Sequence, residues 1–488
     1  MCRDKKRRDL ITMTKYRLKV LVFVLIFSML AGWFPGKTRA ELSIEDEKKM
    51  GDKFLHAALQ QLKLVEDPEV VGYVNKVGQN VVAHLEVHTF PYDFYVVDSG
   101  DLNAFAAPAG HVFINRGLIE IMDDEGELAA ILGHEIGHVQ SRHIAQRVAR
   151  AQKLTIASLG GLLAGILLGG QAGAAAIAAS QAGASSAMLN YSRQDEEEAD
   201  RKGLRYLEAA NYDGEDFVTI MKKMGQESWK AGGHAPTYLQ THPGVPERVA
   251  YLASTVEARP QSSQAIKKDS DSLDTFLLVQ AKLFGGYENP PEALAKFRDW
   301  LARSETKAMA YYGMGLLQER QGMMQEAVDS FKSAINLRPD LVPILVDLGD
   351  TYFQMGEFDK ADSVESSALI LEPEQPMALF VLGRSQLEQG KPAEASKNLA
   401  KAARINDRLP AIHYYLGLAY GRLNQLAEAH YQFGIHYRRA GSFKNAQFHF
   451  MEALKYADSP SRKEAIEKQL QELKGQIKEE QQENNQSR

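Results

Sequence analysis

Cysteine is almost absent from this 488-residue chain, since the only one is Cys2. A single cysteine cannot form an intramolecular disulfide, and no cysteine follows the first apolar run at a position for lipid attachment. If the N-terminal segment is removed, as argued below, the remaining protein has no thiol at all. Its stability then has to come from side-chain packing and bound metal rather than from cross-links.

An excess of basic charge is also missing, because 57 Lys and Arg stand against 63 Asp and Glu. Removal of residues 1–40 would leave 47 basic and 61 acidic residues, a net charge of −14. Nucleic acid is therefore not an expected partner. The 44% apolar and 25% charged composition is that of a globular protein, and the length indicates two or three domains.

Long apolar runs are scarce. One run, Val20 to Gly36, follows eight basic residues and ends near Thr38-Arg39-Ala40. This pattern predicts a secretory signal that is cleaved after Ala40, so that residues 1–40 are a signal peptide. The alternative is an uncleaved anchor, because Val20 to Phe34 is long for a signal core and short for a membrane span.

A second stretch, residues 154–192, has no charged residue and is rich in Gly, Ala and Leu. Its glycines and alanines argue against a true membrane span, which needs about 20 strongly apolar residues. We expect closely packed small-residue helices or a flap over the active site. Peripheral contact with a membrane surface through residues 154–192 is the second reading.

The central motif is Leu132-Gly133-His134-Glu135-Ile136-Gly137-His138, which reads H-E-x-x-H. Residues four apart share one face of a helix, so His134 and His138 can bind one tetrahedral Zn²⁺. Glu135, rotated by about 100°, is then placed as the general base for the attacking water. Apolar residues from Leu128 to Val139 predict the helix independently, and Asp124 with Glu127 predicts its cap.

An acidic run, Asp195-Glu196-Glu197-Glu198, precedes a further helical stretch. It can supply a third zinc ligand, although spacing does not choose among the three glutamates. Glu196 and Asp200 share a face, so one could bind metal while the other holds the second N–H of a ligand imidazole. The alternative is that this acidic run is only a solvent-exposed face of the helix.

The segments before the motif predict helix from Leu42 to about Leu85 and then a small sheet. Tyr92–Val97 and Gly110–Asn115 are short β-rich runs between turn residues. A strand beside a protease cleft can bind the backbone of a substrate by adding it as another strand. A purely structural strand pair is the alternative.

The C-terminal part repeats with a period of 34 residues. The recurring positions are Gly315, Gly349, Gly383 and Gly417; Gly322, Gly356, Gly390 and Asn424; Ala327, Ala361, Ala395 and Ala429; and Phe331, Leu399 and Phe433. This is the tetratricopeptide pattern of stacked helical hairpins, which build a concave surface for a peptide or partner protein. Gly441, Ala446 and Phe450 indicate a closing hairpin at a half-repeat offset.

Several motifs together resemble the HtpX and CAAX prenyl endopeptidase family of zinc metallopeptidases, and within it the periplasmic members with tetratricopeptide repeats. Besides H-E-x-x-H, they are Asn103-Ala104-Phe105-Ala106 with Gly110, Asn115-Arg116-Gly117-Leu118-Ile119, Ser192-Arg193, Glu196-x-x-Ala199-Asp200, and Thr241-His242-Pro243 leading to Arg248. Ala109-Gly110 replaces the family's Gly-Gly, and the paired cysteines of some periplasmic members are absent.

The resemblance implies that Glu196 is the third zinc ligand and that Asp200 supports a ligand from outside the metal. It also places His242 near the metal, where it could stabilise the oxyanion or occupy the fourth zinc position and keep the enzyme latent. A structural histidine is the alternative. For Arg248 we expect an ion pair or a contact with a substrate carboxylate rather than catalysis.

The expected architecture is an α+β zincin-type metallopeptidase domain with a small β-sheet, followed by an α-solenoid. Expected boundaries are 41–256 for the peptidase, 257–272 for a linker, 273–460 for the repeats and 461–488 for a charged helical or disordered tail.

The expected function is cleavage of misfolded or misassembled envelope proteins in the periplasm, either free or peripheral to a membrane, with one Zn²⁺ per chain. The repeats would recruit clients or outer-membrane assembly machinery. The rival is a chaperone or scaffold with a latent protease site. A membrane-embedded prenyl protease is disfavoured because convincing spans are lacking.

Overall fold

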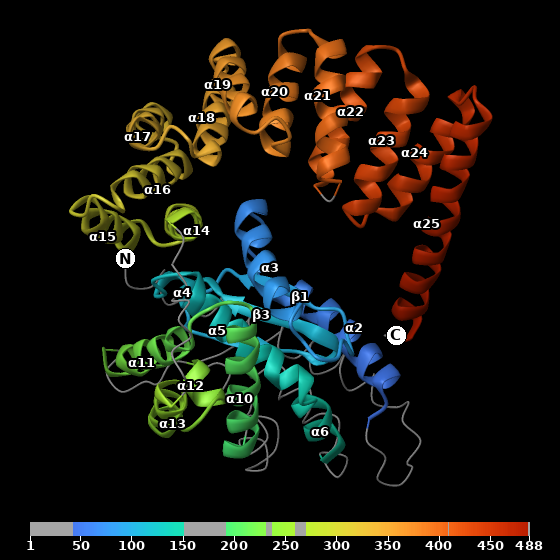
Figure 1. Ribbon diagram of the computed structural model, residues 1–488. Coiled ribbons are helices and arrows are strands. Elements are labelled where there is room, and N and C mark those ends of the chain that lie inside the picture. The colour runs from blue at the N-terminus through green and yellow to red at the C-terminus, as the bar shows by residue number, and fades with distance from the viewer. Residues whose placement is uncertain (1–41, 151–191, 231–236, 259–269, 408, 487–488) are drawn as a thin grey trace, which may run out of the picture. The chain divides into compact units, whose positions relative to one another are not determined.

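The computed structural model describes residues 42–150, 192–230, 237–258, 270–407 and 409–486. The chain divides into two compact units between Leu283 and Phe284. The predicted signal peptide and nearly all of the uncharged segment 154–192 lie outside the described residues, as does most of the predicted linker. Figure 1 shows the helices and strands of each unit.

The first unit contains a three-stranded sheet in the order β1-β3-β2. Strand β1 (Asp93–Val97) runs parallel to β3 (His111–Asn115), with Asp93 opposite His111, and β2 (Ala104–Ala106) runs antiparallel to β3. The two predicted strands are confirmed. β2 was not predicted as a strand because three residues before Pro108 are too few to show a period of two.

Two helices cover this sheet, α2 (Ile44–Gln61) and α3 (Pro68–Val82). The helical region expected from Leu42 to about Leu85 is present as two helices, with a break at residues 62–67. Asp67 caps α3 by accepting from the Glu69 and Val70 N–H groups, and Pro68 is suited to a first helical turn but not to a helix interior. The core on this side stacks the rings of Phe105 and Phe113, with centroids 4.9 Å apart.

The motif helix α5 (Glu125–Gln140) is buried over nearly its whole length. Asp124 caps it by accepting from the Glu127 N–H, as predicted. Helix α10 (Arg193–Ala209) packs along α5, and three glycines let the two backbones meet: Gly133, Gly137 and Gly203. A Cβ on Gly137 would lie 2.7 Å from Ala199 O, and one on Gly203 would lie 2.9 Å from His134 N. Because glycine has no Cβ, these three positions allow α10 to pack against the backbone of the motif helix.

The other helices of this unit are α4 (Arg116–Glu120), α6 (His143–Arg150), α11 (Gly214–Lys230), α12 (Thr237–Thr241) and α13 (Val245–Glu257), together with the 3₁₀ turn Pro108–Gly110. Helix α14 (Ser270–Gly286) begins here as well. Its Gln280 amide donates to Ile119 O and Met122 O, and Lys282 pairs with Asp67 and Glu69.

The second unit is a series of helical hairpins, which confirms the predicted solenoid. Its helices are α15 (Pro290–Leu301), α16 (Lys307–Arg320), α17 (Met324–Leu337), α18 (Val342–Gln354), α19 (Phe358–Leu371), α20 (Pro376–Glu388), α21 (Pro392–Ile405), α22 (Pro410–Arg422), α23 (Leu426–Arg439), α24 (Phe443–Tyr456) and α25 (Pro460–Gln486). Each helix packs mainly against its neighbours in sequence.

The recurring residues have distinct roles in the hairpins. Gly322, Gly356 and Gly390 turn the chain with φ between +72° and +78°, and Asn424 takes the same place with φ +59° because asparagine tolerates this region. At the position of Phe331, which packs on Gly315, the second repeat has Glu365 against Gly349. Phe450 packs on Gly434 in the same way, so α23 and α24 continue the stack at the predicted half-repeat offset.

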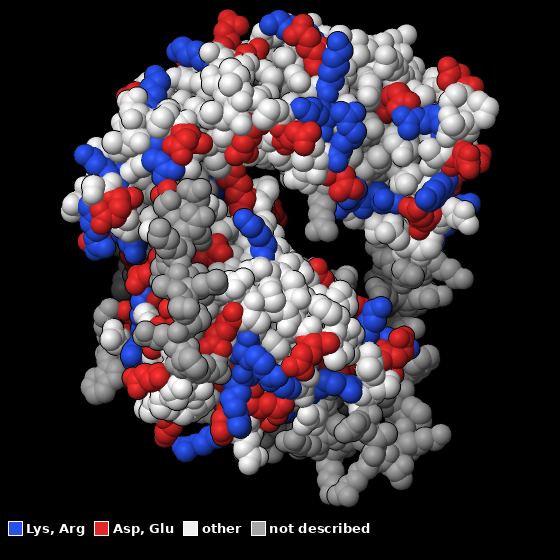
Figure 2. Space-filling view, viewed as in Figure 1, with Lys and Arg blue, Asp and Glu red and all other residues white. Residues whose placement is uncertain are grey.

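Ion pairs join successive repeats at the same spacing, for example Asp350 with Arg384 at 2.7 Å. On the face shown in Figure 2, basic and acidic side chains are interspersed over the repeats. Across the part of the chain that the structure describes, no helix combines the length and apolar character needed to cross a bilayer.

Candidate metal centre

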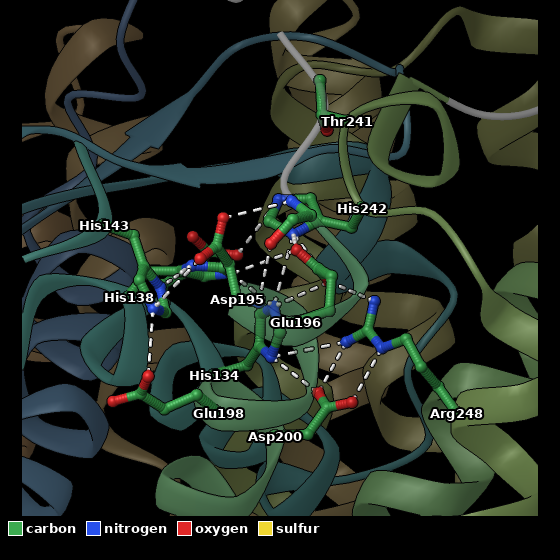
Figure 3. A network of polar contacts seen from close by, with 12 residues as sticks. His134, His138, His143, Asp195, Glu196, Glu198, Asp200, Thr241, His242 and Arg248 are labelled. Atoms are coloured by element: carbon green, nitrogen blue, oxygen red, sulfur yellow. Dashed lines mark hydrogen bonds and ion pairs between the residues drawn. The ribbon is translucent and has the colours of Figure 1, made fainter. Parts of the chain in front are cut away.

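Four buried side chains converge where α5, α10 and the residue after α12 meet. They are His134, His138, Glu196 and His242, and one ligand atom from each lies within 4.8 Å of the others (Figure 3). His134 and His138 come from successive turns of α5, and Glu196 from the first turn of α10. All four are at most 1% exposed.

Four of the separations between these atoms are 3.0–3.4 Å, close to the edge of a tetrahedral zinc site. Nε2 of His134 lies 3.0 Å from His138 Nε2 and 3.3 Å from His242 Nδ1. Glu196 Oε1 lies 3.4 Å from His138 Nε2 and 3.0 Å from His242 Nδ1. Ligands at the usual zinc bond lengths of about 2.0–2.1 Å are roughly 3.3–3.4 Å apart around a tetrahedral ion. Three imidazole nitrogens and a carboxylate oxygen are also the donor types that Zn²⁺ takes, so these residues fit the ion.

The acidic run separates clearly in space. Glu196 points into the cluster, whereas Glu197 is exposed and pairs with Arg201. Glu198 accepts a hydrogen bond from the Ser141 hydroxyl and pairs with Lys202. A capping box between Ser192 and Asp195 begins α10 and sets which residue of the run faces α5.

Charge favours the ligand form of these groups. Burial raises the pKa of the Glu196 carboxyl, but His242 and Arg248 outweigh burial and hold the pKa well below its ordinary value. Burial also lowers the pKa of His138 well below its usual range, against the opposing effect of Glu196. An ionised carboxylate and a neutral imidazole are the states that bind a metal ion.

Asp200 holds His134 from behind. Its Oδ1 lies 2.8 Å from His134 Nδ1, so the imidazole proton sits on Nδ1 and Nε2 faces the cluster. The Arg248 guanidinium binds both oxygens of Asp200, at 2.8 and 2.6 Å, and also pairs with Glu196 at 2.5 Å. Burial raises the pKa of Asp200, but Arg248 and His134 bring it below the ordinary value.

Glu135 lies beside the cluster and outside the group of four. Its side chain is fully buried, and neither oxygen accepts a hydrogen bond of normal geometry among the described residues. The nearest ion-pair partner is His242 Nε2, 3.8 Å from Oε1. Burial raises the pKa of Glu135, while His242 and His134 lower it less strongly. A buried carboxylate with a raised pKa beside the four converging side chains suits a general base.

Two residues near the cluster were not predicted from the sequence. Tyr238 stacks on the His242 imidazole, with ring centroids 4.3 Å apart and an interplanar angle of 17°. His143 Nδ1 lies 2.9 Å from His138 Nδ1. The sequence shows only their spacing: Tyr238 stands four residues before His242, and His143 stands five residues after His138, which is not a helical ligand spacing.

The fold and the site define a metallopeptidase of the H-E-x-x-H type. Residues 68–256 match the model of peptidase family M48, and residues 309–340, 346–411 and 381–434 match tetratricopeptide-repeat models. The chain therefore has a family M48 domain followed by tetratricopeptide repeats, and it is a metalloendopeptidase.

Its similarity to known proteins extends beyond the M48 domain. The beta-barrel assembly-enhancing protease of Yersinia pestis is 28% identical over 368 residues, which is 74% of each chain. The mitochondrial metalloendopeptidase OMA1 of Arabidopsis thaliana is 33% identical over 172 residues, covering 35% of this chain and 32% of that protein. Among solved structures, MamA protein is 21% identical with a TM-score of 0.25 and covers 30% of this chain and 91% of its own. The expected family resemblance is confirmed.

Proposed function

We propose that the chain is a zinc-dependent endopeptidase that cleaves unfolded or misassembled envelope proteins. His134, His138 and Glu196 would hold one Zn²⁺, and His242 lies at the fourth corner. The observation that carries this proposal is the set of four buried donor atoms within 4.8 Å of one another, beside the buried carboxylate of Glu135.

The residues of the site divide the chemistry between them. A bound Zn²⁺ supplies Lewis acidity, which polarises the scissile carbonyl and makes water more acidic. Glu135 takes the proton of the attacking water and returns it to the leaving amine. Asp200 and Arg248 keep His134 and Glu196 in place, so Arg248 acts as an ion-pair residue.

Latency is the second part of the proposal, because His242 stands where water or substrate would have to bind. The Tyr238 N–H at the start of α12 also donates to Leu102 O, two residues before strand β2. All three residues of β2 are buried. We therefore propose that the segment carrying Tyr238 and His242 moves aside before a substrate backbone pairs with β2. The competing function is that of a chaperone or scaffold with an inactive protease site. The position of His242 in the group of four is the observation that favours it.

The substrate class is inferred from the relatives and the repeats. The name beta-barrel assembly-enhancing protease supports outer-membrane β-barrel proteins as clients. The repeat unit, for which we keep the boundaries 273–460, would recruit those clients or their assembly machinery, as solenoid surfaces commonly do. Export through residues 1–40 to the periplasm completes this proposal, with the peptidase at 41–256.

The direct test is proteolysis by the purified full-length chain. An unfolded model protein should be cleaved at internal bonds, and cleavage should stop with a chelator and return with Zn²⁺. A catalytically silent chain that still prevents aggregation of the same substrate would favour the chaperone instead. No metal at the site would contradict both the zinc assignment and the proposed chemistry.

A further inference from the structure

The two histidines of the motif are held in place by different means. His134 contacts a carboxylate directly, through the 2.8 Å contact between its Nδ1 and Asp200 Oδ1. His138 is held by a side chain of another kind. Its Nδ1 faces another imidazole instead, that of His143, at 2.9 Å (Figure 3).

A hydrogen bond between two imidazole nitrogens requires one proton and one lone pair. Nε2 of His138 faces the other ligand atoms, so its lone pair belongs there and the ring proton belongs on Nδ1. His143 Nδ1 must then accept that proton. The proton of His143 consequently sits on Nε2, which lies 3.7 Å from Asp195 Oδ1 and 3.6 Å from Glu198 Oε2. These distances exceed a direct hydrogen bond, but two carboxylates favour N–H on that side.

The chain fixes His143 at this place by an unusual turn. Between α5 and α6, Arg142 adopts φ +53°, a left-handed conformation that is uncommon for a residue other than glycine. Its guanidinium donates to the buried Glu47 carboxylate of α2 at 2.8 Å, which anchors the turn. His143 follows as the first residue of α6 and is 2% exposed.

The two carboxylates are fixed as well. Asp195 belongs to the capping box of α10, and Glu198 is held by Ser141 at 2.8 Å and Lys202 at 2.9 Å. Helix α10 thus supports both motif histidines. Its Asp200 contacts His134 directly, and its Asp195 and Glu198 lie beside His143, which contacts His138.

We propose that His143 is a positioning residue, which accepts the Nδ1 proton of His138 and so keeps His138 Nε2 aimed at the metal. The proposal rests on the proposed metal centre. Outer partners of this kind typically contribute roughly 10–100-fold to metal affinity.

The test compares two substitutions of nearly equal shape at position 143. His143→Asn places an amide oxygen where Nδ1 stood and can accept the same proton, whereas His143→Leu cannot. Zn²⁺ affinity is measured on the full-length chain by competition with a chelator, and Co²⁺ absorption reports the ligand geometry. We expect about 10–100-fold weaker Zn²⁺ binding for His143→Leu and a loss of no more than about threefold for His143→Asn.

Controls separate this role from packing. His111→Leu and His111→Asn change another buried histidine, on β3, whose nearby partners are Asp93 and Tyr95, and should leave Zn²⁺ affinity unchanged. Should His143→Leu fail to fold, His143→Gln replaces it, since its oxygen extends toward Nε2 rather than Nδ1 and should bind Zn²⁺ as weakly.

Equal affinities for the Asn and the Leu or Gln variants would overturn the proposal, whether both were normal or both were weak. A parent chain that binds no Zn²⁺ would instead remove the proposed metal centre itself. A normal parent with unaffected variants would leave the proposed function standing and reject only His143.

Discussion

His242 Nδ1 lies 3.0 Å from Glu196 Oε1, so a histidine from the loop after α12 is in direct contact with a carboxylate of α10. If His242 restrains the enzyme, His242→Ala should bind Zn²⁺ and cleave a model substrate faster. A gain on the order of tenfold would correspond to a restraint of about 1.4 kcal/mol. Cleavage rates and zinc content measured on one sample decide this. An inactive variant that retains zinc would assign His242 to transition-state stabilisation.

The choice of Glu196 among three consecutive glutamates can be tested by metal content. Glu196→Ala should lower Zn²⁺ affinity by more than about 100-fold, because it removes a direct ligand rather than an outer partner. Glu197→Ala is the matched control, since Glu197 is exposed and pairs with Arg201 on the surface of α10. Zinc loss in the control with retention in Glu196→Ala would show that the wrong carboxylate had been assigned.

Close packing of α5 and α10 is a second requirement for the site. Gly203→Ala would put a methyl group 2.9 Å from His134 N and 3.0 Å from Gly133 C. Overpacking of this kind costs about 1–3 kcal/mol, so both unfolding stability and zinc affinity should fall. Gly225→Ala on α11 is the control, because its Cβ meets only Val245, at 3.9 Å. A Gly203→Ala protein with normal stability and zinc binding would contradict the packing account.

Glu365 is a buried carboxylate in a position that apolar residues hold in the other repeats. Both oxygens lack a hydrogen-bond partner among the described residues, and burial with nearby Asp350 and Asp347 raises its pKa well above the ordinary value. The folded state therefore binds this proton more tightly than the unfolded state. The contribution of Glu365 to the free energy of unfolding is therefore greatest at low pH, and it is lost as the pH rises through the folded-state pKa of this carboxyl.

Glu365→Leu should consequently stabilise the repeat unit, by about 1–3 kcal/mol, because it removes an unsatisfied buried polar group. Leu399 already packs on Gly383 at the corresponding place. Urea unfolding of the full chain should show a larger gain at about pH 8 than at about pH 5. Glu394→Leu, on the exposed face of α21, should show no such dependence. A destabilised Glu365→Leu protein would contradict this reading.

Sequence patterns predicted the parts of the site that depend on local geometry. The four-residue spacing of His134 and His138 determines a shared helix face, and the 34-residue period determines stacked hairpins. Glu196 was singled out only by family resemblance, because its position beside α5 depends on contacts between backbones at Gly137 and Gly203. Such contacts between distant segments leave no periodic trace.

The features missed by sequence reasoning have the same origin. Strand β2 is too short to show alternation, and its pairing with β3 follows from the turn at Pro108–Gly110. His143 reaches His138 only because Arg142 adopts a left-handed conformation at the end of α5. The break between α2 and α3 falls at Asp67-Pro68, where an N-cap residue and a proline begin α3.

The most direct test of the account is Glu135→Gln, with zinc content and cleavage of an unfolded protein measured on the same preparation. The amide keeps the shape of the side chain but cannot take the proton of water, so zinc should remain and cleavage should fall by roughly 10²–10⁴-fold. Glu197→Gln should retain both properties. Cleavage by Glu135→Gln within about tenfold of the parent, with zinc retained, would contradict the assignment of Glu135 as the general base.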